Sequence, residues 1–175
     1  EVFKRNNVPE GVSTIVNGDR EVGEWLSKDA RIQLISATGS TRMGKAVSAA
    51  VGQRLGRSLL ELGGNNAIII SDKADLDMAL IGAVFGAVGT CGQRCTSTRR
   101  LIIQDKVYDA FRDKLIKAYG QLRIGDPLNE KNHVGPLIDK DAVKMYENAL
   151  LAAKKQGATI AVEGGVLSGE EYASG

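Results

Sequence analysis

The segment Leu59–Ile70 reads LLELGGNNAIII and joins two short apolar runs through a turn of glycines and asparagines. Apolar runs of this length, bounded by turn residues, are typical of strands inside a sheet. Glu61 lies at the end of the first strand, so we expect a partly desolvated carboxylate that can accept a proton from water. The alternative is a glutamate paired with a surface lysine or arginine. The two glycines favour the functional interpretation because they permit close approach of a ligand, whereas Asn65 and Asn66 are expected to satisfy their own turn.

Apolar runs of strand length alternate with segments of helical periodicity along the chain. This alternation favours right-handed βαβ units, so we predict an α/β fold with parallel sheets and flanking helices. The expected strands are residues 12–16, 32–36, 59–62, 67–70, 101–103 and 160–162. The expected helices are residues 21–26, 41–55, 76–88, 107–122 and 140–156. We expect Trp25 and Tyr119 to lie in the core. Asp72 and Asp75 are expected to cap the start of the helix at 76–88, and Gly157 is expected to cap the end of the helix at 140–156.

Composition excludes several classes of function. The 23 basic and 21 acidic residues are nearly balanced and scattered, which disfavours nucleic-acid binding. Two cysteines and one histidine, His133 on a loop, form neither a disulfide framework nor a metal-ligand cluster, so we expect reduced thiols in a cytoplasmic protein. The long uncharged segment of residues 78–92 is shorter than the about 20 residues of a membrane span. It predicts a buried helix followed by a loop.

The segment Gly39–Gly44 reads GSTRMG and lies between an expected strand and an expected helix. Free N–H groups at a helix start can bind a pyrophosphate, so Gly39, Ser40 and Gly44 are candidate cofactor-binding residues. We expect that substitution of Gly44 by a bulky residue would block the approach of the pyrophosphate and would leave folding largely intact. Ala46 stands where a P-loop needs Ser or Thr for Mg²⁺, and the third glycine of the strict dinucleotide fingerprint is missing. The alternative is a strand-to-helix turn with a serine cap.

The segment Gly89–Thr96 reads GTCGQRCT and surrounds Cys95 with polar and glycine neighbours that do not resemble a buried strand. Arg94 is a permanent cation that favours ionisation of the neighbouring thiol. A thiolate and a carboxylate base are the minimum for covalent acyl chemistry, so Cys95 and Glu61 are candidate catalytic residues. Cys91 lacks a comparable context and is interpreted as a packing or bystander thiol.

The ELGGNNAI and GTCGQRCT motifs, and the separation between them, resemble the aldehyde dehydrogenase superfamily and most closely its α-aminoadipic semialdehyde dehydrogenase branch. The resemblance covers essentially the whole sequence and implies a partial aldehyde dehydrogenase fold with Rossmann-like parallel sheets. It implies that residues 1–62 are the later part of the NAD(P)-binding domain and that residues 63–175 are the first part of the catalytic domain. Because the family's chain extends past both ends, we expect a fragment.

The resemblance further implies NAD(P)-dependent oxidation of an aldehyde, such as α-aminoadipic semialdehyde, to the carboxylic acid through a thioester on Cys95. Glu61 is implied to activate the hydrolytic water, and NAD is the expected cofactor with NADP left open; no metal is required. The family implies a homo-oligomer, a dimer or tetramer, for the full-length form. Arg94 is implied to grip the substrate carboxylate, and a structural salt bridge is the equal alternative.

Two other classes of function stay open from the sequence. The chain could be a truncated, non-catalytic α/β module that serves binding or assembly, because we expect the isolated fragment to be inactive. It could also be a thiol-redox protein that uses Cys91 and Cys95, although their spacing on a loop leaves the disulfide geometry open.

Overall fold

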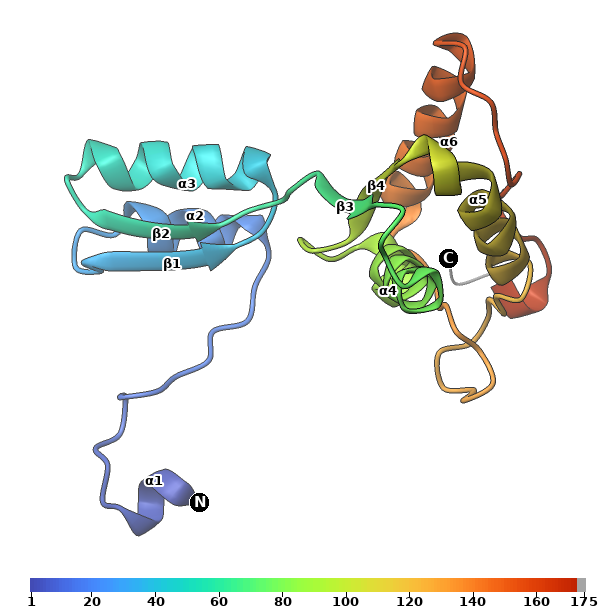
Figure 1. Cartoon of the computed structure of the whole chain (residues 1–175). Helices are drawn as coiled ribbons and strands as arrows, with labels where there is room; N and C mark the ends of the chain where they lie inside the picture. Colours follow the sequence, from blue (N-terminus) through green and yellow to red (C-terminus); the bar gives the residue numbers. More distant parts are fainter. Residues whose placement is uncertain (173–175) are drawn as a thin grey trace. The chain divides into compact units, whose positions relative to one another are not determined.

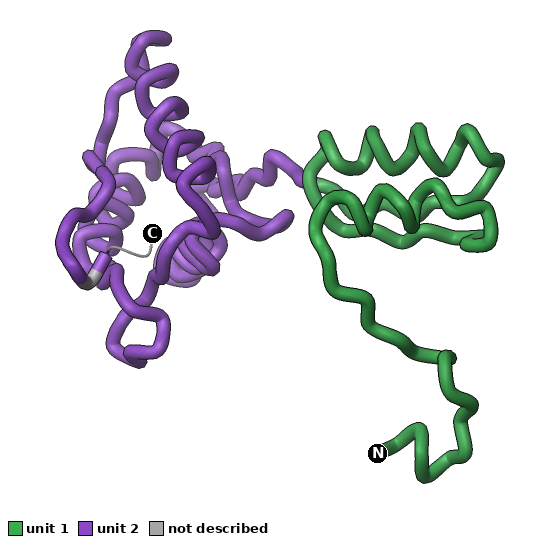
Figure 2. Tube along the Cα trace, turned by 180° about the vertical axis from the view of Figure 1, so that it is seen from behind, with its two compact units in different colours: residues 1–62 green, residues 63–175 purple. Residues whose placement is uncertain are grey.

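A computed structural model describes residues 1–172 of the chain. The chain divides into two compact units, Glu1–Leu62 and Gly63–Gly175, which Figure 2 shows in different colours. No helix among the described residues combines the length and the apolar character needed to cross a membrane. In the described part of the chain, each unit contains one pair of parallel strands, which agrees with the predicted α/β class.

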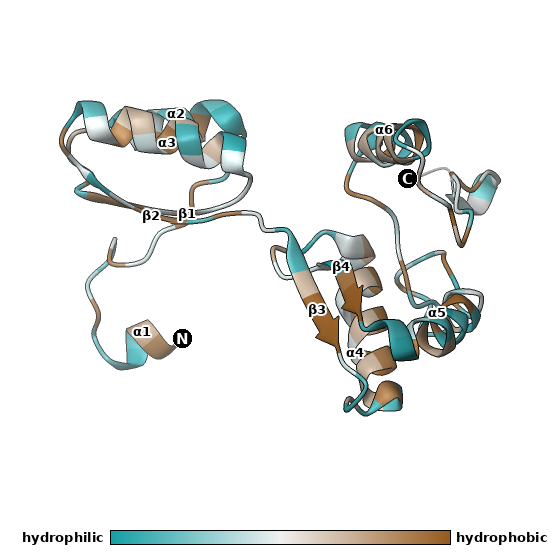
Figure 3. Cartoon of the chain, turned by 45° about the horizontal axis from the view of Figure 1, so that its top comes forward, coloured by the Kyte–Doolittle hydropathy of each residue, from teal (hydrophilic) through white to brown (hydrophobic). Residues whose placement is uncertain are grey.

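The first unit is a strand–helix–strand motif (Figure 1). Its elements are α1 (Val2–Arg5), α2 (Arg20–Lys28), β1 (Leu34–Thr38), α3 (Thr41–Gln53) and β2 (Arg57–Glu61). The two parallel strands pair in a register that puts Leu34 opposite Arg57 and Thr38 opposite Glu61. α3 packs on both strands and on α2. In Figure 3, α2 and α3 lie on the same side of the strand pair.

The second unit repeats this motif and adds further helices. Its elements are β3 (Asn66–Ile70), α4 (Leu76–Val88), the 3-10 helix η1 (Gly89–Gly92), β4 (Thr98–Ile103), α5 (Asp105–Tyr119), α6 (Lys140–Lys155) and the 3-10 helix η2 (Glu170–Tyr172). β3 and β4 pair in parallel, with Ile70 opposite Ile103. The core forms where α4 and α5 meet this pair: Phe111 is 0% exposed and packs with Ile70 and Ala83.

Local capping explains where several helices begin and end. The Asp75 side chain accepts hydrogen bonds from the N–H groups of Asp77 and Met78 and so caps α4, as predicted. Asp72 takes a different role and pairs with Lys106 at 3.4 Å. Gly157 ends α6 with a φ of +84°, a left-handed conformation that suits glycine.

Several expectations about individual elements are wrong. Residues 12–16 and 160–162 form no strand, because neither segment pairs with a strand in the described part of the chain. Trp25 is 65% exposed, since α2 buries Ser27 instead. α5 ends at Tyr119, directly before a glycine, rather than at residue 122.

The apolar helix α4 was expected to be buried, and this is correct for only part of its surface. From residue 78 to its end the helix contains no charged residue, and Figure 3 shows it mainly in brown and white. However, only one face contacts β3, β4 and α5. Ile81 on another face is 71% exposed.

Candidate active site

The turn between β1 and α3 presents free backbone donors at the helix start. Ser40 is the N-cap of α3, and its Oγ accepts a hydrogen bond from the Met43 N–H at 3.1 Å. The N–H groups of Thr41 and Arg42 have no acceptor within the helix, because the first turn of any α-helix leaves its donors unpaired. Such donors, together with the positive end of the helix dipole, suit an anionic group.

Glu61 lies beside this turn because β1 and β2 end at the same edge. The Gly39 N–H donates to the Glu61 carbonyl oxygen at 3.0 Å, which extends the parallel ladder by one bond. The Glu61 residue is exposed, so the expected partial desolvation is wrong for this chain. Among residues 1–172, only β1 and β2 form this sheet, so no neighbouring strand from this part of the chain covers the end of β2.

Gly44, a candidate cofactor-binding residue, also makes a close packing contact. It is buried in the first turn of α3, and a Cβ atom there would lie 2.5 Å from Leu62 Cδ2. The absence of a side chain lets the helix pack closely on the end of β2, as glycine does at close helix–strand contacts. A larger side chain at Gly44 therefore requires the Leu62 side chain to move.

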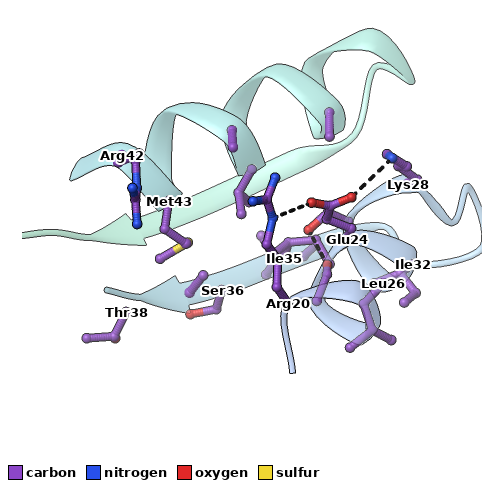
Figure 4. Close-up of a pocket in the computed structure, with 17 residues that line it drawn as sticks. Arg20, Glu24, Leu26, Lys28, Ile32, Ile35, Ser36, Thr38, Arg42 and Met43 are labelled. Carbon is purple, nitrogen blue, oxygen red and sulfur yellow. Dashed lines mark hydrogen bonds and ion pairs between the residues drawn. The ribbon is translucent and has the colours of Figure 1, made fainter. Parts of the chain in front are cut away.

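A pocket in the first unit is lined by residues of α2, β1 and α3 (Figure 4). Arg42 and Met43 line it from the start of α3, close to the Ser40 turn. On α2, Glu24 accepts a hydrogen bond from Arg20 at 2.7 Å and pairs with Lys28 at 3.6 Å. The Arg20 hydrogen bond and charge, with help from Lys28, lower the pKa of the Glu24 carboxyl.

The chain reaches Cys95 through a sharp left-handed turn after α4. Thr90, Cys91 and Gly92 have φ values of 52°, 55° and 69°, and such values are uncommon for residues other than glycine. The Cys91 thiol lies 3.0 Å from the Gly135 carbonyl oxygen, to which it donates. The Gln93 side chain accepts from the Ile138 N–H at 3.1 Å. Cys91 and Gln93 therefore anchor the loop at residues 135–138.

Cys95 itself lies exposed, as a free thiol, in a short turn. The Ser97 N–H donates to the Arg94 carbonyl at 3.1 Å, and the Arg94 N–H donates to Ser97 Oγ at 3.0 Å. Asn66, at the start of β3, donates from its side chain to the Cys95 carbonyl at 2.7 Å. Sequence reasoning missed the contributions of Asn66 and Ser97, because Asn66 was expected to satisfy its own turn.

Arg94 packs on the end of α4. Its guanidinium lies 4.9 Å from the centre of the Phe85 ring, and its Nε donates to the Gly89 carbonyl at 3.4 Å. Within residues 1–172 it forms no ion pair, so the salt bridge considered as its structural alternative is absent from the described chain. A cation over an aromatic face that also caps helix carbonyls is a structural role in itself.

The predicted site residues thus form two groups. The first unit holds the Gly39–Gly44 turn and Glu61, while the second holds Arg94 and Cys95. His133 lies outside both groups, and its Nδ1 accepts from the Arg123 N–H at 3.1 Å. Among the described residues, no three side chains of the metal-binding types gather closely enough to hold an ion.

Comparison with known proteins identifies relatives along the whole chain. The aldehyde dehydrogenase family model matches residues 1–175. Aldehyde dehydrogenase family 7 member A1 from Pisum sativum is 46% identical over 97% of this chain and 34% of its own length. Alpha-aminoadipic semialdehyde dehydrogenase from Bos taurus is 44% identical over 95% of this chain and 31% of its own length. The chain therefore spans about a third of the length of these relatives.

Solved structures show the same fold. An NADP-dependent enzyme from E. coli has a TM-score of 0.88 at 36% identity, over 97% of this chain and 36% of that chain. Betaine aldehyde dehydrogenase from Staphylococcus aureus, in complex with NAD+, has a TM-score of 0.85 at 30% identity, over 90% of this chain and 31% of that chain. These matches confirm the predicted partial fold with parallel sheets and flanking helices. The chain belongs to the aldehyde dehydrogenase family.

Proposed function

We propose that this chain carries the cofactor turn, the nucleophile and the base of an NAD(P)-dependent aldehyde dehydrogenase that oxidises a semialdehyde to the acid. The observation that carries the proposal is the exposed, free Cys95 in a turn fixed by hydrogen bonds. Membership of the family and the similarity to an alpha-aminoadipic semialdehyde dehydrogenase support the reaction class and the substrate class.

In the proposed reaction, the Cys95 thiolate forms a C–S bond with the aldehyde carbon and gives an oxyanion that needs donors. The Cys95 N–H is a candidate donor, because no acceptor takes it within residues 1–172. The bound nicotinamide cofactor supplies the acceptor for the hydride that leaves this carbon. Glu61 then takes a proton from water, the water oxygen adds to the thioester carbon, and the C–S bond breaks to release the acid and the thiolate.

The first unit fits a dinucleotide. Residues 39–44 combine free N–H groups of α3 with a Ser40 cap, which suits a pyrophosphate. The adjacent pocket, with apolar side chains from α2 and β1 and the Arg20–Glu24–Lys28 group, suits the remainder of a nucleotide. We propose NAD as the cofactor on the strength of the semialdehyde branch, and the E. coli relative makes NADP the competing ligand.

Arg94 is the proposed contact for the substrate carboxylate. Its contacts with the carbonyl groups of Gly89 and Phe85 use two of the five guanidinium N–H donors, which leaves donors for a carboxylate. The free thiols of Cys91 and Cys95 support a reducing, cytoplasmic compartment. Assembly of the full-length form into a dimer or tetramer is part of the proposal and rests on the family alone.

The proposal can be tested in a chimera in which this chain replaces the 167 matched residues of the Bos taurus enzyme. With NAD and α-aminoadipic semialdehyde, the chimera should reduce NAD, and the Cys95→Ser chimera should not. A folded chimera that binds NAD but lacks turnover would favour the non-catalytic module. A reversible Cys91–Cys95 disulfide without turnover would favour the thiol-redox protein.

Cofactor binding can be tested on the chain itself by thermal shift. NAD or NADP should raise the melting temperature, while ATP with Mg²⁺ should not, because Ala46 cannot ligate the metal. Stabilisation by Mg-ATP alone would contradict the cofactor assignment.

A further inference from the structure

The side chain of Asn66 bridges two backbone carbonyls on either side of Thr96. Its Nδ2 donates to the Cys95 carbonyl at 2.7 Å and to the Ser97 carbonyl at 3.1 Å. A carboxamide nitrogen has two hydrogens, so both are used by this one turn. Asn66 belongs to the start of β3, and these bonds therefore join the nucleophile turn to a strand that precedes it by about thirty residues.

The same turn is closed from the inside by Ser97. This residue is only 2% exposed, donates its N–H to the Arg94 carbonyl and accepts the Arg94 N–H on its Oγ. Inner and outer hydrogen bonds together restrict the backbone on both sides of Cys95. Loops without such bonds open locally at little cost in free energy.

Asn66 is itself held in place by its surroundings. The Arg100 side chain donates to the Asn65 carbonyl at 2.6 Å, and the Arg99 side chain donates to the Gly64 carbonyl at 3.2 Å. A Cβ atom on Gly64 would lie 3.1 Å from Asn66 Oδ1 and 3.4 Å from the Cys95 carbonyl oxygen. Glycine at this position therefore gives the Asn66 side chain room to reach the turn.

We propose that Asn66 is a positioning residue for Cys95, which it serves by clamping the turn Arg94–Ser97 from outside. This rests on the proposed function, in which Cys95 is the nucleophile. The clamp occupies the carbonyl of Cys95 and leaves its N–H free for the oxyanion, so the reacting geometry is set before the aldehyde arrives. In an Asn66→Ser variant, the serine could replace one of the two hydrogen bonds, whereas the side chain of an Asn66→Ala variant could replace neither. An Asn66→Asp variant would place a carboxylate against two carbonyl oxygens.

The clamp can be measured on the chain itself by hydrogen exchange, followed by NMR at single amides. Asn66→Ala should speed exchange of the Ser97 amide about tenfold, with a smaller effect for Asn66→Ser, while the Phe111 amide in the core stays unchanged. Asn65→Ala is the matched control and should resemble the wild type. The proposal would be overturned if the Ser97 amide of Asn66→Ala exchanged at the wild-type rate. It would also be overturned if exchange sped up equally at Phe111 and Ser97 in both Asn66 variants, because that would indicate general destabilisation.

The consequence for catalysis is measured in the chimera as the rate of the first burst of reduced nicotinamide. Asn66→Ala should slow the burst about tenfold or more and leave the KM for NAD unchanged, with partial rescue by Asn66→Ser. If the unmodified chimera shows no burst, the proposed function fails, whereas the exchange result still decides whether the clamp exists. If the unmodified and Asn66→Ala chimeras burst at the same rate, the positioning role fails and the proposed function stands.

Discussion

The Gly39 N–H donates to the Glu61 carbonyl oxygen at 3.0 Å, so the start of the proposed cofactor turn and the proposed base are bonded neighbours. This contact follows from the parallel register that pairs Thr38 with Glu61. Parallel strands bring their carboxyl ends to one edge, which is where open α/β sheets bind ligands. The contact therefore brings the two motifs to one edge of the sheet, as the proposed reaction requires.

The Gly44 substitution tests close packing in the first unit. Gly44→Ala should be about 1 kcal/mol less stable than Gly52→Ala, because the Leu62 side chain must move to admit the new Cβ atom. Gly52→Ala in the same helix has open space and is the control, which should be neutral or stabilising. Urea unfolding measures both variants. Equal stability of the two variants would contradict the packing role.

The two thiols should differ in reactivity. Cys95 is exposed, whereas Cys91 is half-buried and its thiol contacts the Gly135 carbonyl. Iodoacetamide should therefore modify Cys95 faster than Cys91 in the 175-residue chain, as measured by peptide mass spectrometry. Cys91→Ala should leave the Cys95 rate unchanged. Equal rates, or faster labelling of Cys91, would argue against Cys95 as the reactive thiol.

The Asp29–Arg31 pair predicts an acid-dependent contribution to stability. Hydrogen bonds from Arg31 lower the pKa of the Asp29 carboxyl to about 2. A carboxyl whose pKa is lower in the folded state stabilises the fold above its unfolded pKa of about 3.9, and this stabilisation is lost as pH falls towards 2. Between about pH 5 and pH 2, the urea midpoint of the wild type should fall more than that of Asp29→Asn. If the urea midpoints of the two proteins fell in parallel with pH, the Asp29–Arg31 pair would contribute nothing to stability.

Arg94 can be tested with two aldehydes in the chimera. Arg94→Lys keeps the charge but loses the planar fork that binds a carboxylate through two hydrogen bonds. The KM for α-aminoadipic semialdehyde should rise, with little change for hexanal, which has no carboxylate. An equal rise in KM for both aldehydes would show that Arg94 does not bind the substrate carboxylate. Its role would then be limited to its contacts with Phe85 and Gly89 at the end of α4.

Local sequence patterns predicted much of the framework. Asp75 and Gly157 were identified as helix ends because capping depends on neighbouring residues alone. Residues 12–16 and Trp25 were misjudged because a strand needs a partner and a buried face needs a covering element, and neither is encoded locally. The apolar character of α4 likewise did not reveal which of its faces would be packed.

In the candidate site, too, short motifs predicted the local features but not the contacts that depend on the tertiary fold. The cap by Ser40 and the free thiol of Cys95 follow from short motifs. The clamp by Asn66 depends on the pairing of β3 with β4, which brings the start of β3 to the Cys95 turn. The contact of Gly44 with Leu62 could not be predicted, because it depends on how α3 packs against the end of β2.

The most direct test of the central claim is mass spectrometry of the Glu61→Gln chimera after it reacts with NAD and α-aminoadipic semialdehyde. Without the base, acylation should proceed and hydrolysis should slow by about 10²–10⁴-fold, so the acyl group should accumulate as a thioester on Cys95. Peptide mapping should find this mass increase on Cys95 and none on Cys91. Normal steady turnover of the Glu61→Gln chimera, or an acyl group on any residue other than Cys95, would contradict the mechanism.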